Sequence, residues 1–452
     1  MDATANTGNL KVGTGYRQIL SIALPVTLAL VVPQLNFITN NIFIGQLGVK
    51  ALGNAGITGV FYLILSVMGN GFNNGLQSLI SRSAGSGDLG AISTYFSQGL
   101  RIVFQFALGA ILFTWFIAPL CLQPFIAADN LQTITNFLKI RVIGLPFLFA
   151  FQLCNAFLVG TLNSRYLMIG TIAEAGLNIL LDYLLIFGHW GFPELGFNGA
   201  AWASAIAEML GLVVVLTVIY QLKLKKRFGL FTSFRFAKTF NRQLLSVSMP
   251  LVLQYFISLV TWLIFFLMIE PYGDVDKAIS NVMRNVFGFI GIFAWAFAST
   301  SNTMVANLIG QGLQHKVIPT IQRIALLSMC TTAFMALLLN LFPGVFFGLF
   351  GEDKAFIDRA IPVMRVVSVA LLCMSICTTW LNGLTGTGKT NINLMTEIVG
   401  ISLYIIYTII AMKIYHVPIA MAWSNELVYW SSMFTISYLY MRSGRWKKGI
   451  GN

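Results

Sequence analysis

Charged side chains are scarce in this chain of 452 residues, in which Asp, Glu, Lys and Arg together make up 10%. Soluble globular proteins carry about 25% charged residues. Acidic residues are the rarest, with 15 Asp and Glu against 28 Lys and Arg. Hydrophobic residues make up 57% and the mean hydropathy is +0.79. The composition excludes an ordinary soluble domain and predicts an integral membrane protein that is surrounded by the lipid bilayer.

Metal-binding and disulfide-forming residues are also few. All five cysteines lie within apolar segments, and the three histidines lie at segment ends. Neither residue type shows the spacing of zinc ligands or of a disulfide framework. We therefore interpret the cysteines as small buried side chains and expect no cofactor and no structural metal.

Apolar stretches of roughly 20 residues, long enough to span a bilayer, recur about twelve times. The backbone in lipid must satisfy its hydrogen bonds within the segment, so each stretch is predicted to be a helix. The predicted fold class is an all-α integral membrane protein with twelve transmembrane helices. The expected ranges are 17–46, 52–80, 95–122, 133–160, 166–188, 197–222, 243–269, 278–309, 320–350, 359–385, 391–414 and 417–440.

The first half of the sequence returns in the second half. The segment 18–25, which ends at Pro25, returns as 243–250, and Glu174 returns as Glu397 at an offset of 223 residues. Many transporters consist of two such repeats, with a path between the bundles. The repeat predicts two pseudo-symmetric six-helix bundles. We expect an N-terminal lobe at 1–222, a basic linker at 223–242 and a C-terminal lobe with a short tail at 243–452.

The net charge of +13 is concentrated in particular connections. The linker 223–242 and the tail after Arg442 are basic, whereas the connection with Asp274 and Asp276 is acidic. Basic cytoplasmic loops are the rule for membrane proteins. We therefore expect no nucleic-acid partner, and we expect a multi-pass protein of the cell's inner (plasma) membrane with both termini in the cytoplasm. The polar residues 1–16 contain no signal-peptide core, so the first apolar segment should be retained.

The segment 383–390, Gly-Leu-Thr-Gly-Thr-Gly-Lys-Thr, fits the P-loop pattern at every position. A P-loop connects a strand to a helix, where its backbone N–H groups bind phosphate. Here an apolar helical segment precedes the motif and another follows it. The corresponding turn in the first repeat, 160–165, is no P-loop. We interpret the motif as a short cytoplasmic turn and expect no enzyme activity.

One helix carries a polar stripe. Thr171, Glu174, Asn178 and Asp182 are spaced three or four residues apart, so they share one face of the segment 166–188. Ionisable groups at bilayer depth are costly and indicate function. Asp182 lies 17 residues after Arg165, or about 25 Å along a helix, which places it in the outer leaflet.

Two further segments should bring polar groups to the same level. Asn36 and Asn40 lie one turn apart near the outer end of the first segment, and Ser204 lies near the outer end of the sixth. A carboxylate among amide and hydroxyl oxygens binds a proton or a small hard cation such as Na⁺. The pattern predicts an ion site at Asp182, Asn178, Asn40 and Ser204.

The second repeat lacks this set, because Asp182 corresponds to Ile405 and Asn40 to Phe265. It contains Glu397 and Glu426 instead, whose roles the sequence leaves open. Arg284 and Arg365 are expected at its outer end.

Three segments resemble the multidrug and toxic compound extrusion (MATE) family. They are Pro25 with 40–48 (NNIFIGQLG), 177–188 (LNILLDYLLIFG) and 191–201 (GFPELGFNGAA). The resemblance covers nearly the whole chain and implies twelve helices in two lobes, with efflux driven by H⁺ or Na⁺ entry. Family members usually have Asp at the position of Asn40 and Thr at that of Ser204. Ser258 stands where some branches carry Glu, so their C-terminal ion site is absent here.

The leading prediction is a monomeric secondary active antiporter that exports amphipathic, often cationic organic compounds or drugs in exchange for H⁺ or Na⁺. An alternative is a flippase-like transporter of a lipid-linked or anionic substrate. Four cationic residues favour this alternative, since cationic walls suit phosphate: Lys139, Arg141, Arg284 and Arg365. A third interpretation, a nucleotide-binding enzyme, would rest on 383–390 alone. The candidate residues for ion coupling and substrate binding are Asp182, Asn178, Asn40, Ser204, Glu174, Asn155, Asn36 and Pro25.

Overall fold

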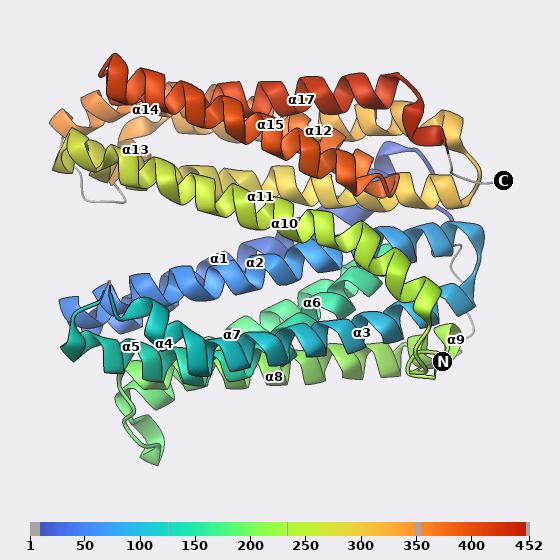
Figure 1. Ribbon diagram of the computed structural model, residues 1–452, viewed down its shortest axis with the longest axis horizontal. Coiled ribbons are helices and arrows are strands. Elements are labelled where there is room, and N and C mark those ends of the chain that lie inside the picture. The colour runs from blue at the N-terminus through green and yellow to red at the C-terminus, as the bar shows by residue number, and fades with distance from the viewer. Residues whose placement is uncertain (1–9, 125, 233, 349–353, 449–452) are drawn as a thin grey trace. The chain divides into compact units, whose positions relative to one another are not determined.

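The computed structural model describes residues 10–124, 126–232, 234–348 and 354–448, and this part of the chain contains helices but no strand (Figure 1). Two short π-helical stretches interrupt the pattern, at Phe113–Ile117 and Ile410–Ile414. The α-helices are α1 Tyr16–Gln46, α2 Val49–Ser86, α3 Leu89–Leu112, α4 Ala118–Leu122, α5 Ala128–Arg141, α6 Leu145–Gly160, α7 Leu167–Phe187, α8 Phe197–Gln221, α9 Leu224–Phe228, α10 Lys238–Ile269, α11 Asp274–Gly310, α12 Val317–Leu341, α13 Pro343–Gly348, α14 Lys354–Gly386, α15 Thr390–Ile409, α16 Ile419–Ala422 and α17 Asn425–Arg442.

The helices match the predicted spans closely. Within the described residues, eleven helical segments are long and apolar enough to cross a membrane, from Tyr16–Gln46 to Thr390–Ile414. The twelfth predicted span corresponds to α16 and α17, and α17 has 18 residues and carries the buried Glu426. The predicted segment 320–350 is divided between α12 and α13, and its positions 349 and 350 lie outside the described residues. The predicted all-α membrane fold with twelve helices in two bundles is confirmed.

Packing divides the chain into two compact units. The first unit consists of Met1–Thr27 with Leu253–Asn452, and the second of Leu28–Val252. Helices α1 and α10 therefore each contribute one part to each unit. The division of the sequence into lobes at 1–222 and 243–452 describes the repeat and remains a prediction.

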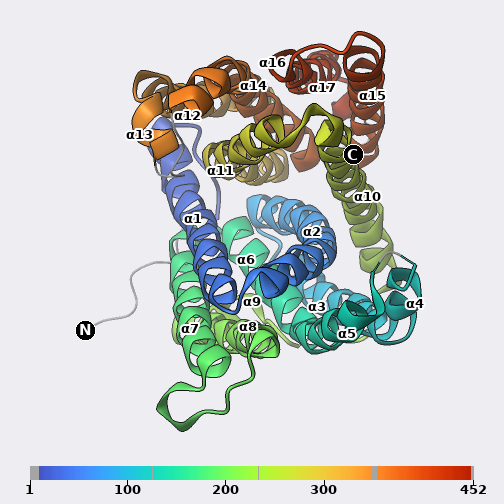
Figure 2. The ribbon, with the colours of Figure 1, turned by 90° about the vertical axis from the view of Figure 1, so that its left-hand side faces the viewer.

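Corresponding helices pack in both units. Helix α2 packs on α6 and α7 on α8 in the second unit, and α11 packs on α14 and α15 on α17 in the first (Figure 2). The first part of α10 completes the second unit, where Ser248 Oγ donates a hydrogen bond of 3.0 Å to the Phe72 carbonyl of α2. Gly75 permits this contact, because a Cβ there would lie 2.4 Å from Ser248 Oγ.

A small apolar cluster fixes the helices that carry the predicted ion site. Ile44 of α1, Ile186 of α7 and Ala200 of α8 are buried together. The Phe43 and Phe187 rings meet edge-on with their centroids 5.9 Å apart. The cluster holds α1 beside α7 and α8, which are distant from it in sequence, at the ends where the polar residues lie.

Candidate functional site

Asp182 is the centre of the polar set in the second unit. Its side chain is 0% exposed, and its Oδ2 accepts a hydrogen bond of 3.2 Å from Asn40 Nδ2. Its other oxygen, Oδ1, has no hydrogen-bond donor among the described residues. Asp182 forms no ion pair with a described Lys, Arg or His. A buried carboxylate with a free oxygen and no cationic partner requires a proton or a bound cation, because an isolated buried charge is very unfavourable.

Asn178, one turn before Asp182, continues the set. Its Oδ1 accepts a hydrogen bond of 2.7 Å from Asn36 Nδ2, and its Nδ2 donates one of 3.3 Å to Ser204 Oγ. The pairs Asn36–Asn178 and Asn40–Asp182 have the same sequence separation of 142 residues. This equal separation means that α1 and α7 run in the same direction and in register. The structure thus brings together Asn36, Asn40, Asn178, Asp182 and Ser204 from α1, α7 and α8.

The remaining predicted residues lie apart from these contacts. Glu174 follows the same face of α7 and packs against Gly211 of α8, but it makes no hydrogen bond with a described residue. Asn155 of α6 has a buried Oδ1 that no described residue hydrogen-bonds. Pro25 is half-buried in the part of α1 that belongs to the first unit. None of these three bonds to the Asp182 set, and their roles remain predictions.

A buried ion pair lies in the same unit, and the sequence did not predict it. Arg141 binds Glu208 through two parallel hydrogen bonds of 2.8 and 2.6 Å. Tyr62 donates to both Glu208 oxygens at 2.9 and 3.1 Å, and its ring lies 3.6 Å from Arg141 Cζ. Arg141 is therefore neutralised and does not offer the free cation that favoured an anionic substrate. The only sequence signal was that Arg141 and Glu208 are both expected in apolar helices.

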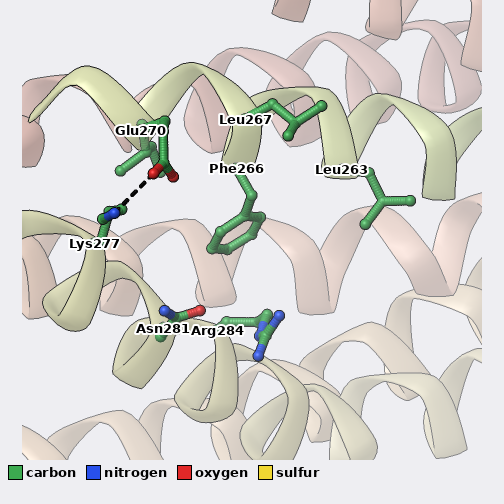
Figure 3. Close-up of a pocket in the computed structure, with 8 residues that line it drawn as sticks. Leu263, Phe266, Leu267, Glu270, Lys277, Asn281 and Arg284 are labelled. Atoms are coloured by element: carbon green, nitrogen blue, oxygen red, sulfur yellow. Dashed lines mark hydrogen bonds and ion pairs between the residues drawn. The ribbon is translucent and has the colours of Figure 1, made fainter. Parts of the chain in front are cut away.

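A pocket of about 430 Å³ lies in the first unit, between the end of α10 and the start of α11 (Figure 3). One wall is apolar, with Leu263, Phe266 and Leu267, and the other carries Asn281 and Arg284. Lys277 is bound by Glu270 at 2.8 Å. Arg284 forms no ion pair with a described carboxylate, and its Cζ lies 5.5 Å from the centre of the Phe266 ring. The pocket therefore combines an apolar surface with one unpaired positive charge.

The P-loop-like segment 383–390 connects two helices, because Gly386 ends α14 and Thr390 begins α15. Gly383 and Gly386 serve helix packing, whereas Gly388, with a φ of +80°, serves the turn. A Cβ on Gly386 would lie 2.6 Å from the Asn302 carbonyl of α11. The Lys389 N–H donates to Thr387 Oγ1 at 3.3 Å, so it is engaged within the turn. The strand that a P-loop requires is absent from these described residues.

Comparison with known proteins agrees with this architecture. The sequence profile of the MatE family matches twice, at residues 25–184 and 250–410. A Thermotoga maritima protein described as "Probable multidrug resistance protein NorM" is 23% identical over 439 residues, which are 96% of this chain and 93% of the relative. A Synechocystis protein of the same description is 25% identical over 69% of this chain and 67% of its own length.

Solved structures share the fold. A Pyrococcus furiosus transporter of the MOP superfamily superposes with a TM-score of 0.88 at 15% identity, covering 99% of this chain and 100% of the other. A structure described as the outward-facing conformation of a multidrug resistance MATE family transporter gives the same values. The two profile matches coincide with the two sequence repeats and together cover most of the chain. The chain belongs to the MatE family of multidrug and toxic compound extrusion transporters and is a multi-pass membrane protein.

Proposed function

We propose that this protein is a secondary active antiporter that exports amphipathic organic compounds in exchange for H⁺ or Na⁺, with Asp182 as the coupling group. The observation that carries the proposal is the free, buried Oδ1 of Asp182. A carboxylate that alternates between a bound and an unbound ion can couple the ion gradient to a change in conformation. The relatives described as multidrug resistance proteins support drug-like substrates.

The neighbours of Asp182 suit reversible ion binding. Asn40 and Asn178 are neutral amides, and Ser204 is a neutral hydroxyl, so none fixes the charge of the carboxylate. Their carbonyl and hydroxyl oxygens are ligands of the type that hard cations prefer. The buried Asn36 Oδ1, which has no donor among the described residues, adds a further acceptor. We propose that these four residues position the ion and that Asp182 supplies the charge.

The placement of basic connections supports a plasma-membrane protein with both termini in the cytoplasm. We propose that it works as a monomer, with the proposed ion site contained in one unit of one chain.

Export by proteoliposomes tests the function, with H⁺ and Na⁺ gradients imposed separately. Asp182→Asn should abolish gradient-driven export of a fluorescent organic cation, because the amide cannot exchange an ion. The matched control is Asp358→Asn, which changes an exposed carboxylate and should leave export unchanged. Wild-type export by Asp182→Asn, at equal reconstituted amounts of protein, would refute the role of Asp182.

A second candidate function is transport of an anionic amphiphile or lipid-linked substrate. The unpaired Arg284 beside the apolar wall of the α10–α11 pocket favours it. Arg284→Gln should then reduce export of anionic amphiphiles at least tenfold and leave export of organic cations unchanged. Equal effects on both substrate classes would exclude this candidate.

A further inference from the structure

Among the described residues of the first unit, two buried carboxylates have no cationic partner and are not used by the proposed coupling mechanism, whereas the buried Asp276 is paired with Arg359. Glu397 of α15 is 1% exposed and Glu426 of α17 is 3% exposed. Neither forms an ion pair or a hydrogen bond with a described Lys, Arg or His. They differ in this from Glu208, whose charge is compensated by Arg141.

Glu397 is surrounded by neutral groups from two other helices. Gln254 Nε2 donates to its Oε2 at 3.1 Å, and the Tyr429 hydroxyl donates to its Oε1 at 2.6 Å. The Ser258 hydroxyl also bonds to Oε1. These three donors, from α10 and α17, stabilise the ionised form without adding a positive charge.

The same partners can also accommodate a protonated Glu397. Ser and Tyr hydroxyls accept as well as donate, and an amide offers a carbonyl oxygen when it turns over. Gln254 is 9% exposed, and its Oε1 is a buried acceptor with no donor among the described residues. A half-turn of this amide would present Oε1 to a proton on Glu397 Oε2. An arginine, which only donates, would not permit this exchange.

The other titratable groups around Glu397 are neutral or acidic. Tyr429 faces it from α17, and Cys377 lies near it on α14. The Tyr404 ring on α15 packs edge-on against Tyr429, with the centroids 5.8 Å apart.

Glu426 has a different environment. Trp430 Nε1 donates to its Oε2 at 2.9 Å and Tyr404 to its Oε1 at 3.4 Å. The indole N–H can only donate, and neither of these two partners carries an unpartnered buried acceptor. The features that suit reversible proton binding therefore coincide at Glu397.

We propose that Glu397 reversibly binds a proton and forms a second proton site of this chain, in the unit that lacks Asp182. The proton passes between water and Glu397 Oε2, and Gln254 alternates between donating to the carboxylate and accepting from the acid. The inference deepens the proposed function, because a second proton would be available to drive export. The use of this proton in transport rests on the proposed function, whereas proton binding by Glu397 does not.

Infrared difference spectra of the purified protein in lipid, recorded between high and low pH, test the binding directly. A protonated carboxyl gives a separate C=O stretching band. We expect Glu397→Gln to remove one such band, which should persist in Asp182→Asn. The matched control is Glu426→Gln, which changes a carboxylate of the same unit and similar burial and should keep the Glu397 band.

Gln254→Met provides a second test that retains the carboxyl group. Without its acceptor, the protonated Glu397 should show its C=O band at higher frequency. A Glu397→Gln spectrum that superimposes on the wild-type spectrum would overturn the proposal, and so would an unshifted band in Gln254→Met. Neither measurement uses transport, so the two proposals can fail separately. If Asp182→Asn retained wild-type export, the role of Asp182 would be refuted, and the infrared band would still show whether Glu397 binds a proton.

Discussion

At the scale of single residues, the second unit contains two buried carboxylates with opposite environments. Glu208 is held by Arg141 and Tyr62, whereas the Asn40 amide is the only described group that donates a hydrogen bond to Asp182. Arg141 and Tyr62 donate hydrogen bonds to both oxygens of Glu208, so its charge and its acceptors are compensated within the protein. We interpret Glu208 and Arg141 as a structural pair that holds α5 against α8. We interpret Asp182 as the group that is free to change its charge.

The Arg141–Glu208 pair predicts that replacing one partner lowers the stability more than replacing both. Arg141→Met leaves Glu208 buried without its partner, which costs about 3–5 kcal/mol. Replacing both residues, as in Arg141→Met with Glu208→Leu, should recover most of this loss. Thermal unfolding of the detergent-solubilised proteins measures both effects. A double variant that is as unstable as Arg141→Met would show that the pair has another role.

Asn40 offers a test of the site geometry. Asn40→Asp places a second carboxylate beside Asp182, and two such groups repel, so one should hold its proton more tightly. The pair could also bind a cation more strongly than one carboxylate. We expect export to acquire a shifted pH profile, a stronger Na⁺ dependence or both.

The matched control for this change is Asn41→Asp. Asn41 is on the same helix but donates to the Phe37 carbonyl at 3.0 Å, and no hydrogen bond joins it to Asp182. Its export profile against pH and Na⁺ should match that of the wild type. Superimposable profiles for all three proteins would contradict the role of Asn40 at the ion site.

Helical spacing predicted that Asn40, Asn178 and Ser204 lie near Asp182, and hydrogen bonds between these helices agree. It did not predict the pairing of Tyr62 with Glu208 or of Gln254 with Glu397. The partners Tyr62 and Glu208 are 146 positions apart, and Gln254 and Glu397 are 143 apart. Such pairs depend on how helices are rotated about their axes, which one sequence does not reveal.

At the scale of elements, small residues determine how closely helices approach. Gly383 and Gly386 of α14 contact α12 and α11 at distances that leave no room for a Cβ. Gly160 of α6 has the same role in the other repeat, because a Cβ there would lie 2.9 Å from Ile80 Cγ2 of α2. The resemblance of 383–390 to a phosphate-binding loop thus reflects a packing requirement at Gly383 and a turn with positive φ at Gly388.

This interpretation predicts different effects for two residues of the motif. Gly386→Val should lower the stability by about 1–3 kcal/mol or more through overpacking. Lys389→Ala should change the stability by about 0.5 kcal/mol or less and leave export unchanged. Thermal unfolding and proteoliposome export measure these effects. Loss of export in Lys389→Ala, together with ATP binding by the wild type, would restore the nucleotide-binding interpretation.

Element positions were largely predictable because each bilayer-length apolar run needs its own helix. The interruptions were not predicted. The π-helical stretches Phe113–Ile117 and Ile410–Ile414 lie within apolar runs, where hydropathy shows no change.

At the scale of the whole molecule, the start of the chain is attached to the first unit. Asn307 of α11 binds the backbone of this segment twice, through Leu10 O at 2.8 Å and the Val12 N–H at 3.0 Å. Arg323 of α12 donates to the Thr14 carbonyl at 2.7 Å. Residues 10–14 are therefore held by side chains nearly 300 positions away.

Removing this attachment should expose the segment to proteases. Asn307→Ala loses both hydrogen bonds to the segment 10–14, which together contribute about 1–3 kcal/mol. We expect faster cleavage near residues 10–14 and a lower unfolding temperature. The control Lys316→Ala changes an exposed side chain at the same end of the unit. Equal cleavage rates in Asn307→Ala and in the wild type would contradict this role of Asn307.

The division of α1 and α10 between the two units has a consequence for biosynthesis. Residues 10–27 leave the ribosome before the rest of their unit, whose other part begins at Leu253. Leu28–Val252 can fold as soon as the start of α10 has been made, while the beginning of α1 still lacks its neighbours. The first part of α1 therefore makes its native contacts only after the second repeat has been synthesised. We expect that inserting the helices of the second repeat too slowly would leave the first helix half-assembled in the membrane, where quality-control proteases act.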